Sequence, residues 1–151
     1  MLSERLAALG LTLPPAQAPL ASYVPVRRAG ELLYLSGHVC RSGGEVVRGV
    51  VGADLEPAAA ALLARTVALD LLAGAAAALG SVDRIAGVVR ITGYVRSTPG
   101  FDGQAAVING ASDLLVELFG ERGRHARSAV GVSELPLGAA LEIEAIFEVA
   151  D

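Results

Sequence analysis

The sequence predicts a single α+β domain of two layers, in which helices cover one face of a sheet in the order β-β-β-α-β-α-β-β. Apolar and polar residues alternate over 127–132 and 141–149, which is the period of a strand. A long Ala/Leu-rich run at 57–79 has the length of a helix that packs on a sheet. The 151 residues contain no repeat, linker or low-complexity tract, so one domain is assigned to 1–151.

The first 18 residues are expected to form a lead-in to the sheet. Within it, Ser3–Leu9 predicts a short amphipathic helix, and residues 13–19 predict an extended segment because proline disfavours helix. The next strands are predicted at Tyr23–Arg28 and Leu32–Ser36, and a third at Glu45–Val51 after a Ser-Gly-Gly turn.

The long helix at Pro57–Leu79 is expected to begin after Asp54 as a candidate N-cap and to end at Gly80. Its faces are mostly alanine and leucine, which favours close packing on a sheet. We expect its two charged side chains, Arg65 and Asp70, to be exposed to solvent rather than catalytic.

The rest of the chain predicts a strand at Ile85–Arg96, a helix at Phe101–Phe119 and two final strands at 127–132 and 141–149. Residues 135–138, Leu-Pro-Leu-Gly, supply a tight turn between the final strands.

The polar faces of the final strands suggest chemistry. If the strands pair, Arg127 and a carboxylate among Glu142, Glu144 and Glu148 could share one sheet face. A guanidinium fits a carboxylate bidentately, so an anion-binding and acid/base pair is one interpretation. A surface ion pair or a solvated sheet face is the other, and residue types alone leave both open.

Composition excludes several classes of function. All 12 basic residues are arginine, so neither a Schiff-base lysine nor a P-loop lysine is available. The net charge of −4, with 4% aromatic residues and no basic run, argues against nucleic-acid binding. Hydrophobic residues make up 53% and the mean hydropathy is +0.54, which predicts apolar surface buried between subunits of an oligomer.

No metal, cofactor, membrane or secretion signal is expected. Cys40 is the only cysteine, and His38 and His125 lack metal-ligand spacing. The N-terminus lacks the pattern of a secretory signal. Arg65 and Asp70 interrupt the apolar run at 57–79 at a cost of about 2.5–3.5 kcal/mol each in a bilayer. A soluble cytoplasmic protein is the expectation.

Short motifs in the last third of the chain resemble those of a known protein family. Ala126-Arg127-Ser128, Leu135-Pro136 and the run Glu142–Ile146, at this spacing, resemble the C-terminal signature of the Rid family, also called YjgF-like or endoribonuclease L-PSP. The run Tyr34–Gly37 resembles a second motif of that family. The resemblance extends from about Pro19 to the end of the chain.

The match has departures. His38 stands where the family usually has glutamine, and Ala129 where the archetype often has cysteine. The segment around Asn109 resembles a YjgF-like subgroup more than the archetypal deaminases.

The resemblance implies a chorismate-mutase-like (YjgF-like) fold and a homotrimer with a site at each subunit interface. Archetypal members hydrolyse reactive enamines and imines of 2-carboxylates to 2-oxo acids and ammonia, without a metal or organic cofactor. The resemblance therefore implies a deaminase that acts on a small carboxylate-bearing metabolite. A non-catalytic trimer that binds a small carboxylate is the alternative, and an endoribonuclease, which the acidic chain disfavours, is a third.

The resemblance also assigns roles to five residues. Arg127 would bind the substrate carboxylate, Glu142 would hold the attacking water, Ser36 and Asn109 would orient the substrate, and Tyr23 would close over it. Each has a structural alternative: an ion pair for the charged residues, and turn, packing or helix–sheet contacts for the others. Arg127 and Glu142 are expected to line one cleft that several copies of the chain complete.

Overall fold

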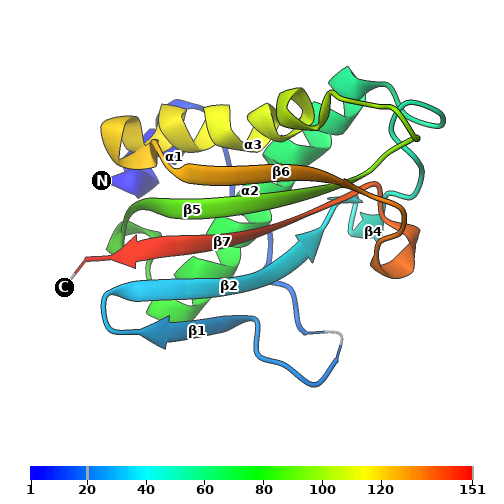
Figure 1. Ribbon diagram of the computed structural model, residues 1–151. Helices are drawn as coiled ribbons and strands as arrows, with labels where there is room; N and C mark the ends of the chain where they lie inside the picture. Colours follow the sequence, from blue (N-terminus) through cyan, green and yellow to red (C-terminus); the bar gives the residue numbers. More distant parts are fainter. Residues whose placement is uncertain (20, 151) are drawn as a thin grey trace.

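A computed structural model describes residues 1–19 and 21–150; positions 20 and 151 of the predicted domain lie outside the described residues. Its main feature is a five-stranded sheet with helices on one face (Figure 1). Across the sheet the strands are β1 (Val26–Ala29), β2 (Leu32–Val39), β7 (Leu141–Val149), β5 (Ile85–Arg96) and β6 (Ala126–Val132). The α-helices are α1 (Leu2–Ala8), α2 (Pro57–Leu79) and α3 (Gln104–Phe119). Short 3-10 turns span Val82–Arg84, Gly120–Gly123 and Pro136–Gly138.

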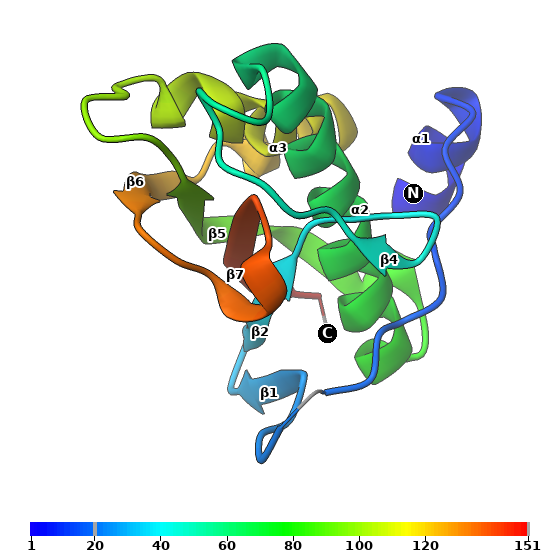
Figure 2. The same cartoon turned by 90° about the vertical axis from the view of Figure 1, so that its right-hand side faces the viewer.

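The two layers are built as the alternation of side chains predicts. Figure 2 shows α2 and α3 gathered on one side of the sheet. The described residues between α1 and β1, 9–19 and 21–25, are called the lead-in from here on, and they pass α2 toward β1. The sheet residues that face the helices include Leu33, Ile91, Ile143 and Phe147, all at most 1% exposed. The alternate residues of β5 and β7 form an opposite, open face. The predicted α+β class is confirmed.

The last two strands do not pair with each other, which corrects the prediction. β6 pairs in parallel with β5, and β7 pairs antiparallel with both β5 and β2, so β5 separates them. The reason is that α3 provides the crossover connection that a parallel neighbour of β5 requires. The turn at Pro136–Gly138, where Leu137 has a φ of 59°, therefore links β6 to a strand two places away.

Several predicted boundaries also move. The first strand begins at Val26 rather than Tyr23, after Pro25, which has no backbone N–H to donate. The predicted third strand shrinks to β4 (Glu45–Val46), which pairs only with β3 (Arg41–Ser42) in a separate small sheet.

The prediction that Asp54 is the N-cap of α2 is wrong, because its side chain is used in the loop before the helix. The Asp54 carboxylate accepts a hydrogen bond from the Val50 backbone N–H at 2.8 Å and so closes the loop before α2. The N-cap of α2 is Glu56, and Gly80 ends the helix with a left-handed φ of 79°, as expected. The next helix, α3, begins at Gln104 rather than Phe101.

Helix α2 is the apolar centre of the second layer. It is long and apolar enough to span a membrane, but 56% of its most apolar window is buried within the protein, as in a core helix of a soluble domain. The expectation that Asp70 is exposed is wrong, because only 6% of it is accessible. Arg65 lies at the surface, where it pairs with Glu117 at 3.1 Å.

Candidate functional site

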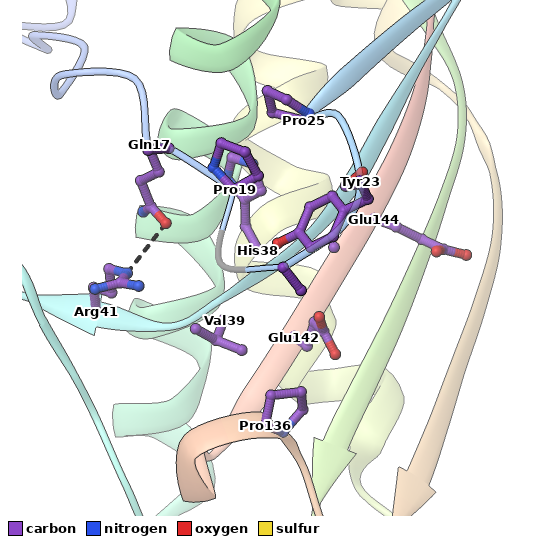
Figure 3. A pocket seen from close by; sticks show the side chains of 14 residues that line it. Gln17, Pro19, Tyr23, Pro25, His38, Val39, Arg41, Pro136, Glu142 and Glu144 are labelled. Atoms are coloured by element: carbon purple, nitrogen blue, oxygen red, sulfur yellow. Dashed lines mark hydrogen bonds between the residues drawn. The ribbon is translucent and has the colours of Figure 1, made fainter.

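A cavity of about 480 Å³ lies between the lead-in and the strands β2 and β7. Its polar lining comes from three segments, which Figure 3 shows converging on one space. The lead-in contributes Gln17 and Tyr23, and β7 contributes Glu142 and Glu144. The remaining polar contributions come from the end of β2 and the start of β3: Ser36, Gly37, His38 and Arg41.

Glu142 is the most unusual charged group of this cavity. It lies on the open face of β7, between Tyr94 of β5 and Val39 of β2, and is half-buried. The pKa of its carboxyl is raised, first because burial disfavours the charged form and second because Glu144 lies on the same face. Among the described residues no side chain donates a hydrogen bond to it. This carboxyl is therefore suited to take up or release a proton.

Gly37 allows Glu142 to take this position. β2 has a bulge between Leu35 and His38, so one extra residue opposes β7 there. A β-carbon at position 37 would lie 2.5 Å from Glu142 Oε1 and 2.9 Å from its Cδ. The carboxylate thus occupies space that any side chain at position 37 would fill.

Two other residues that the sequence points to also line the cavity. The Ser36 hydroxyl donates to the Val24 carbonyl oxygen at 2.8 Å, which holds the lead-in against β2 and leaves the hydroxyl oxygen able to accept. Tyr23 is 45% exposed at the cavity mouth, as a residue that closes over a ligand requires. Their predicted substrate contacts stay predictions.

Arg127 and Asn109 lie together, but at a different place. Arg127 Nη1 donates to Asn109 Oδ1 at 2.8 Å and to Ser112 Oγ at 3.1 Å, and its Nη2 donates to the Ala105 carbonyl at 3.3 Å. All three acceptors are neutral groups of α3. The guanidinium is thus fixed in orientation, and no carboxylate in the described part of the chain pairs with it.

His125 extends this cluster at the edge of the sheet. Its Nε2 lies 2.9 Å from Ser112 Oγ and its Nδ1 lies 2.6 Å from the Gly123 carbonyl oxygen. Since a carbonyl only accepts, Nδ1 carries the proton and the Ser112 hydroxyl donates to Nε2. Burial lowers the pKa of His125, with a smaller contribution from Arg127, so the ring is kept neutral beside the guanidinium.

The prediction that Arg127 and Glu142 share one sheet face is wrong within a single chain. Arg127 is paired with Ile91, a fully buried residue on the helix side of β5, whereas Glu142 is paired with Tyr94 on the open face. The two side chains therefore lie on opposite sides of the sheet. One copy of the chain does not bring the predicted guanidinium and carboxylate together.

The side of the cavity away from Glu142 is lined by three polar side chains without a predicted role, Gln17, His38 and Arg41. Arg41 Nε donates to Gln17 Oε1 at 3.1 Å, shown as the dashed line in Figure 3. The buried Asp70 lines a neighbouring hollow together with Gln17 and Arg41; burial raises the pKa of its carboxyl, and Gln17 and Arg41 partly oppose that rise. His38 is buried beside Gly74 of α2, and burial, followed by Arg41, lowers the pKa of its ring.

Sequence signals for the missed residues were uneven. Ser112 follows Asn109 by three positions on a helix, so a shared face was predictable. Glu144 was not missed: it is one of the candidate carboxylates, and it shares a face with Glu142 as strand alternation predicts. Nothing local indicated that Gln17 would reach Arg41, because that contact joins the lead-in to β3. No group of three or more His, Cys, Asp or Glu side chains that could hold a metal occurs among residues 1–19 and 21–150.

Comparison with known proteins gives the family. Residues 3–148 match the family described as "YjgF/chorismate mutase-like, putative endoribonuclease". Protein TCP17 of Trypanosoma cruzi is 44% identical over 142 residues, which cover 93% of this chain and 89% of that protein.

Solved structures agree in fold. The protein Atu1372 of Agrobacterium tumefaciens, of unknown function, is 44% identical with a TM-score of 0.89, covering 99% of this chain and 92% of that one. RidA from the Antarctic bacterium Psychrobacter sp. PAMC 21119 is 26% identical with a TM-score of 0.62, covering 89% of this chain and 94% of that one. The chain therefore belongs to the YjgF/chorismate mutase-like (Rid) family, as its C-terminal motif indicated.

Proposed function

We propose that this protein is a hydrolytic deaminase of small enamine and imine 2-carboxylates, which yields 2-oxo acids and ammonia. The observation that carries the proposal is the Glu142 carboxyl, half-buried against Gly37 in a cavity with a raised pKa. A carboxyl with its pKa moved toward neutrality works as a general base and then as a general acid. Hydrolysis of an imine needs a base for the attacking water and an acid for the departing amine, and one carboxyl can serve as both in turn.

In the proposed reaction, an enamine first takes a proton from solvent at its β-carbon and becomes an iminium cation. Ionised Glu142 then accepts a proton from water while the water oxygen bonds to the iminium carbon and the C=N π electrons pass to the nitrogen. The same proton passes from Glu142 to the amine nitrogen of the tetrahedral adduct. The C–N bond breaks, the hydroxyl proton passes to the departing ammonia as the carbonyl forms, and ammonium leaves, so Glu142 ends ionised as it began.

The carboxylate anchor in this proposal is Arg127 of a second copy. Because Arg127 and Glu142 face opposite sides of the sheet in one chain, the proposed site needs a second copy, and the homotrimer that the family resemblance implies would supply it. Two features support such an assembly. β6, which carries Arg127, is an edge strand paired only with β5 in the sheet, and exposed edges are suited to association. Exposed Tyr34, Val89 and Val130 also leave apolar area for a partner to cover.

Ammonia release from freshly generated 2-aminoacrylate tests the proposal. Wild type should accelerate it above the spontaneous rate, and Glu142→Gln should lose about 100-fold or more, since general acid–base catalysis contributes 10²–10⁴-fold. Glu148→Gln is the matched control, because Glu148 lies on the same strand and face but pairs with Arg122 outside the cavity.

The alternatives are read from the same preparations. Equal rates for wild type and Glu142→Gln, together with retained carboxylate binding, would leave only a binding or regulatory trimer. Cleavage of RNA by the purified trimer, lost in Arg127→Ala, would favour an endoribonuclease instead.

A further inference from the structure

The guanidinium of Arg41 lines the cavity but has no part in the deaminase scheme above. Figure 3 places Arg41 beside Gln17, on the opposite side of the lining residues from Glu142, with His38 and Val39 between them. The cavity therefore has carboxylates at one end, Glu142 and Glu144, and a cation at the other.

Arg41 is fixed in place without a counter-charge bonded to it. Nε donates to Gln17 Oε1 at 3.1 Å and Nη1 donates to the Gly44 carbonyl at 3.1 Å, both neutral acceptors. No carboxylate within the described ranges lies at ion-pair distance from it. The Nη2 group donates no hydrogen bond to any of those residues, and so has donors available for a ligand.

The surrounding groups do not neutralise this charge by direct contact. Asp70 is buried behind Gln17, and its pKa is raised by burial despite the opposing effects of Gln17 and Arg41. Burial, followed by Arg41, lowers the pKa of the neighbouring His38, so its ring stays neutral and supplies no counter-charge. A ligand with an apolar end here would cover the partly buried guanidinium and leave its Nη2 group without an acceptor, which costs binding energy.

We propose that Arg41 is a specificity-determining residue that binds a second acidic group of the substrate. The favoured substrates are then imines of dicarboxylic amino acids, with the reacting carbon at Glu142 and the distal carboxylate at Arg41. This assignment of substrate class rests on the proposed deaminase function. Binding of a distal carboxylate also accounts for the neutral hydrogen-bond partners of Arg41, which orient the guanidinium and leave its charge for a ligand.

The test compares two imines of similar length, 2-iminoglutarate and 2-iminohexanoate, each released in situ from its amino acid. Wild type should hydrolyse the acidic imine with a kcat/KM about 10- to 100-fold higher, the range of one charge-assisted contact. Arg41→Gln should lose most of that preference and keep its rate on 2-iminohexanoate. The ratio of the two rates on one preparation does not depend on the fraction of protein that is folded.

Two further variants control the result. Arg41→Lys keeps the charge but not the fork, and should retain an intermediate preference. Arg124→Gln removes an exposed arginine outside the cavity that pairs with Glu121, and should leave the ratio unchanged. Equal losses on both imines in Arg41→Gln, or a wild type without acidic preference, would overturn the inference.

A binding measurement separates this inference from the deaminase proposal. Calorimetry with 2-oxoglutarate and 2-oxohexanoate should show tighter binding of the diacid in wild type and not in Arg41→Gln. If neither imine is hydrolysed, the deaminase proposal fails, and this comparison alone decides whether Arg41 binds a second acidic group. Equal binding of the two acids would then overturn the inference as well.

Discussion

The surroundings of Glu142 and those of Arg127 differ in how each charge is treated. Arg127 donates three hydrogen bonds to neutral acceptors on α3, so its guanidinium is stabilised and oriented. Glu142 has a like charge, Glu144, on its own face, and burial raises its pKa. The surroundings of Arg127 stabilise its positive charge, whereas the surroundings of Glu142 favour the protonated, neutral form of its carboxyl.

This difference indicates distinct tasks for the two regions. A fixed guanidinium binds an anion without having to reorganise, whereas a carboxyl with a raised pKa exchanges protons. Within one chain the guanidinium of Arg127 and the carboxyl of Glu142 do not meet, because they lie on opposite faces of the sheet. Three predictions test whether the regions meet and what each contributes.

The largest expected effect comes from mixing subunits. If the proposed homotrimer forms, the Arg127→Ala and Glu142→Gln proteins should each be nearly inactive, but trimers that contain both variants should regain about one wild-type site in three, with Glu142 from one chain and Arg127 from another. Ammonia release by co-expressed, doubly tagged trimers measures this. Co-expression of Arg127→Ala with the double variant, which supplies no intact Arg127, is the control. Mixed trimers without any recovery would show that the two residues do not meet.

The next effect concerns the space that Glu142 occupies. Gly37→Ala would place a β-carbon 2.5 Å from Glu142 Oε1 and should displace that carboxylate, with a loss of about 10- to 100-fold in kcat. The melting temperature should change little, because the displaced atoms are the end of a flexible side chain.

Gly74→Ala is the matched control for that substitution. A β-carbon at position 74 would lie 3.7 Å from His38 Cε1, an ordinary contact, and alanine favours a helix by up to about 1 kcal/mol. Activity should persist in Gly74→Ala. An active Gly37→Ala enzyme would mean that the observed carboxylate position is not the catalytic one.

The smallest effect is a shift of the pH profile. Glu144 raises the pKa of Glu142, so Glu144→Gln should lower it and move the acidic limb of kcat/KM to lower pH, with the rate at high pH retained. Glu148→Gln should leave that limb in place. An unmoved limb in Glu144→Gln would assign it to another group.

The same shift has a consequence for stability. A carboxyl whose folded pKa is raised favours folding at low pH, and this contribution is lost as pH rises through the folded pKa. The melting temperature of wild type should therefore decline as pH rises from the ordinary pKa of a glutamate to the raised pKa of Glu142. Glu144→Gln should show a smaller decline over this pH range.

Strand alternation was sufficient to place Glu142 and Glu144 on one face, because a period of two is local. It could not place Arg127, whose face relative to Glu142 depends on which strand lies between β6 and β7. The crossover through α3 determines that, and it acts over more than twenty residues of sequence. Asp70 shows the same limit: it is buried on an apolar helix and lines a hollow with Gln17, a residue more than fifty positions away in the sequence.

The packing of α2 against α3 determines where Arg127 sits. A β-carbon at Gly110 would collide with the backbone carbonyl of Ala61 on α2, so the two helices approach as closely as their main chains permit. Asn109 and Ser112, which hold the guanidinium, flank that point of contact on α3. The close approach of α2 and α3 at Gly110 thus determines the position of the proposed anchor Arg127, and an added methyl group at position 110 would displace it.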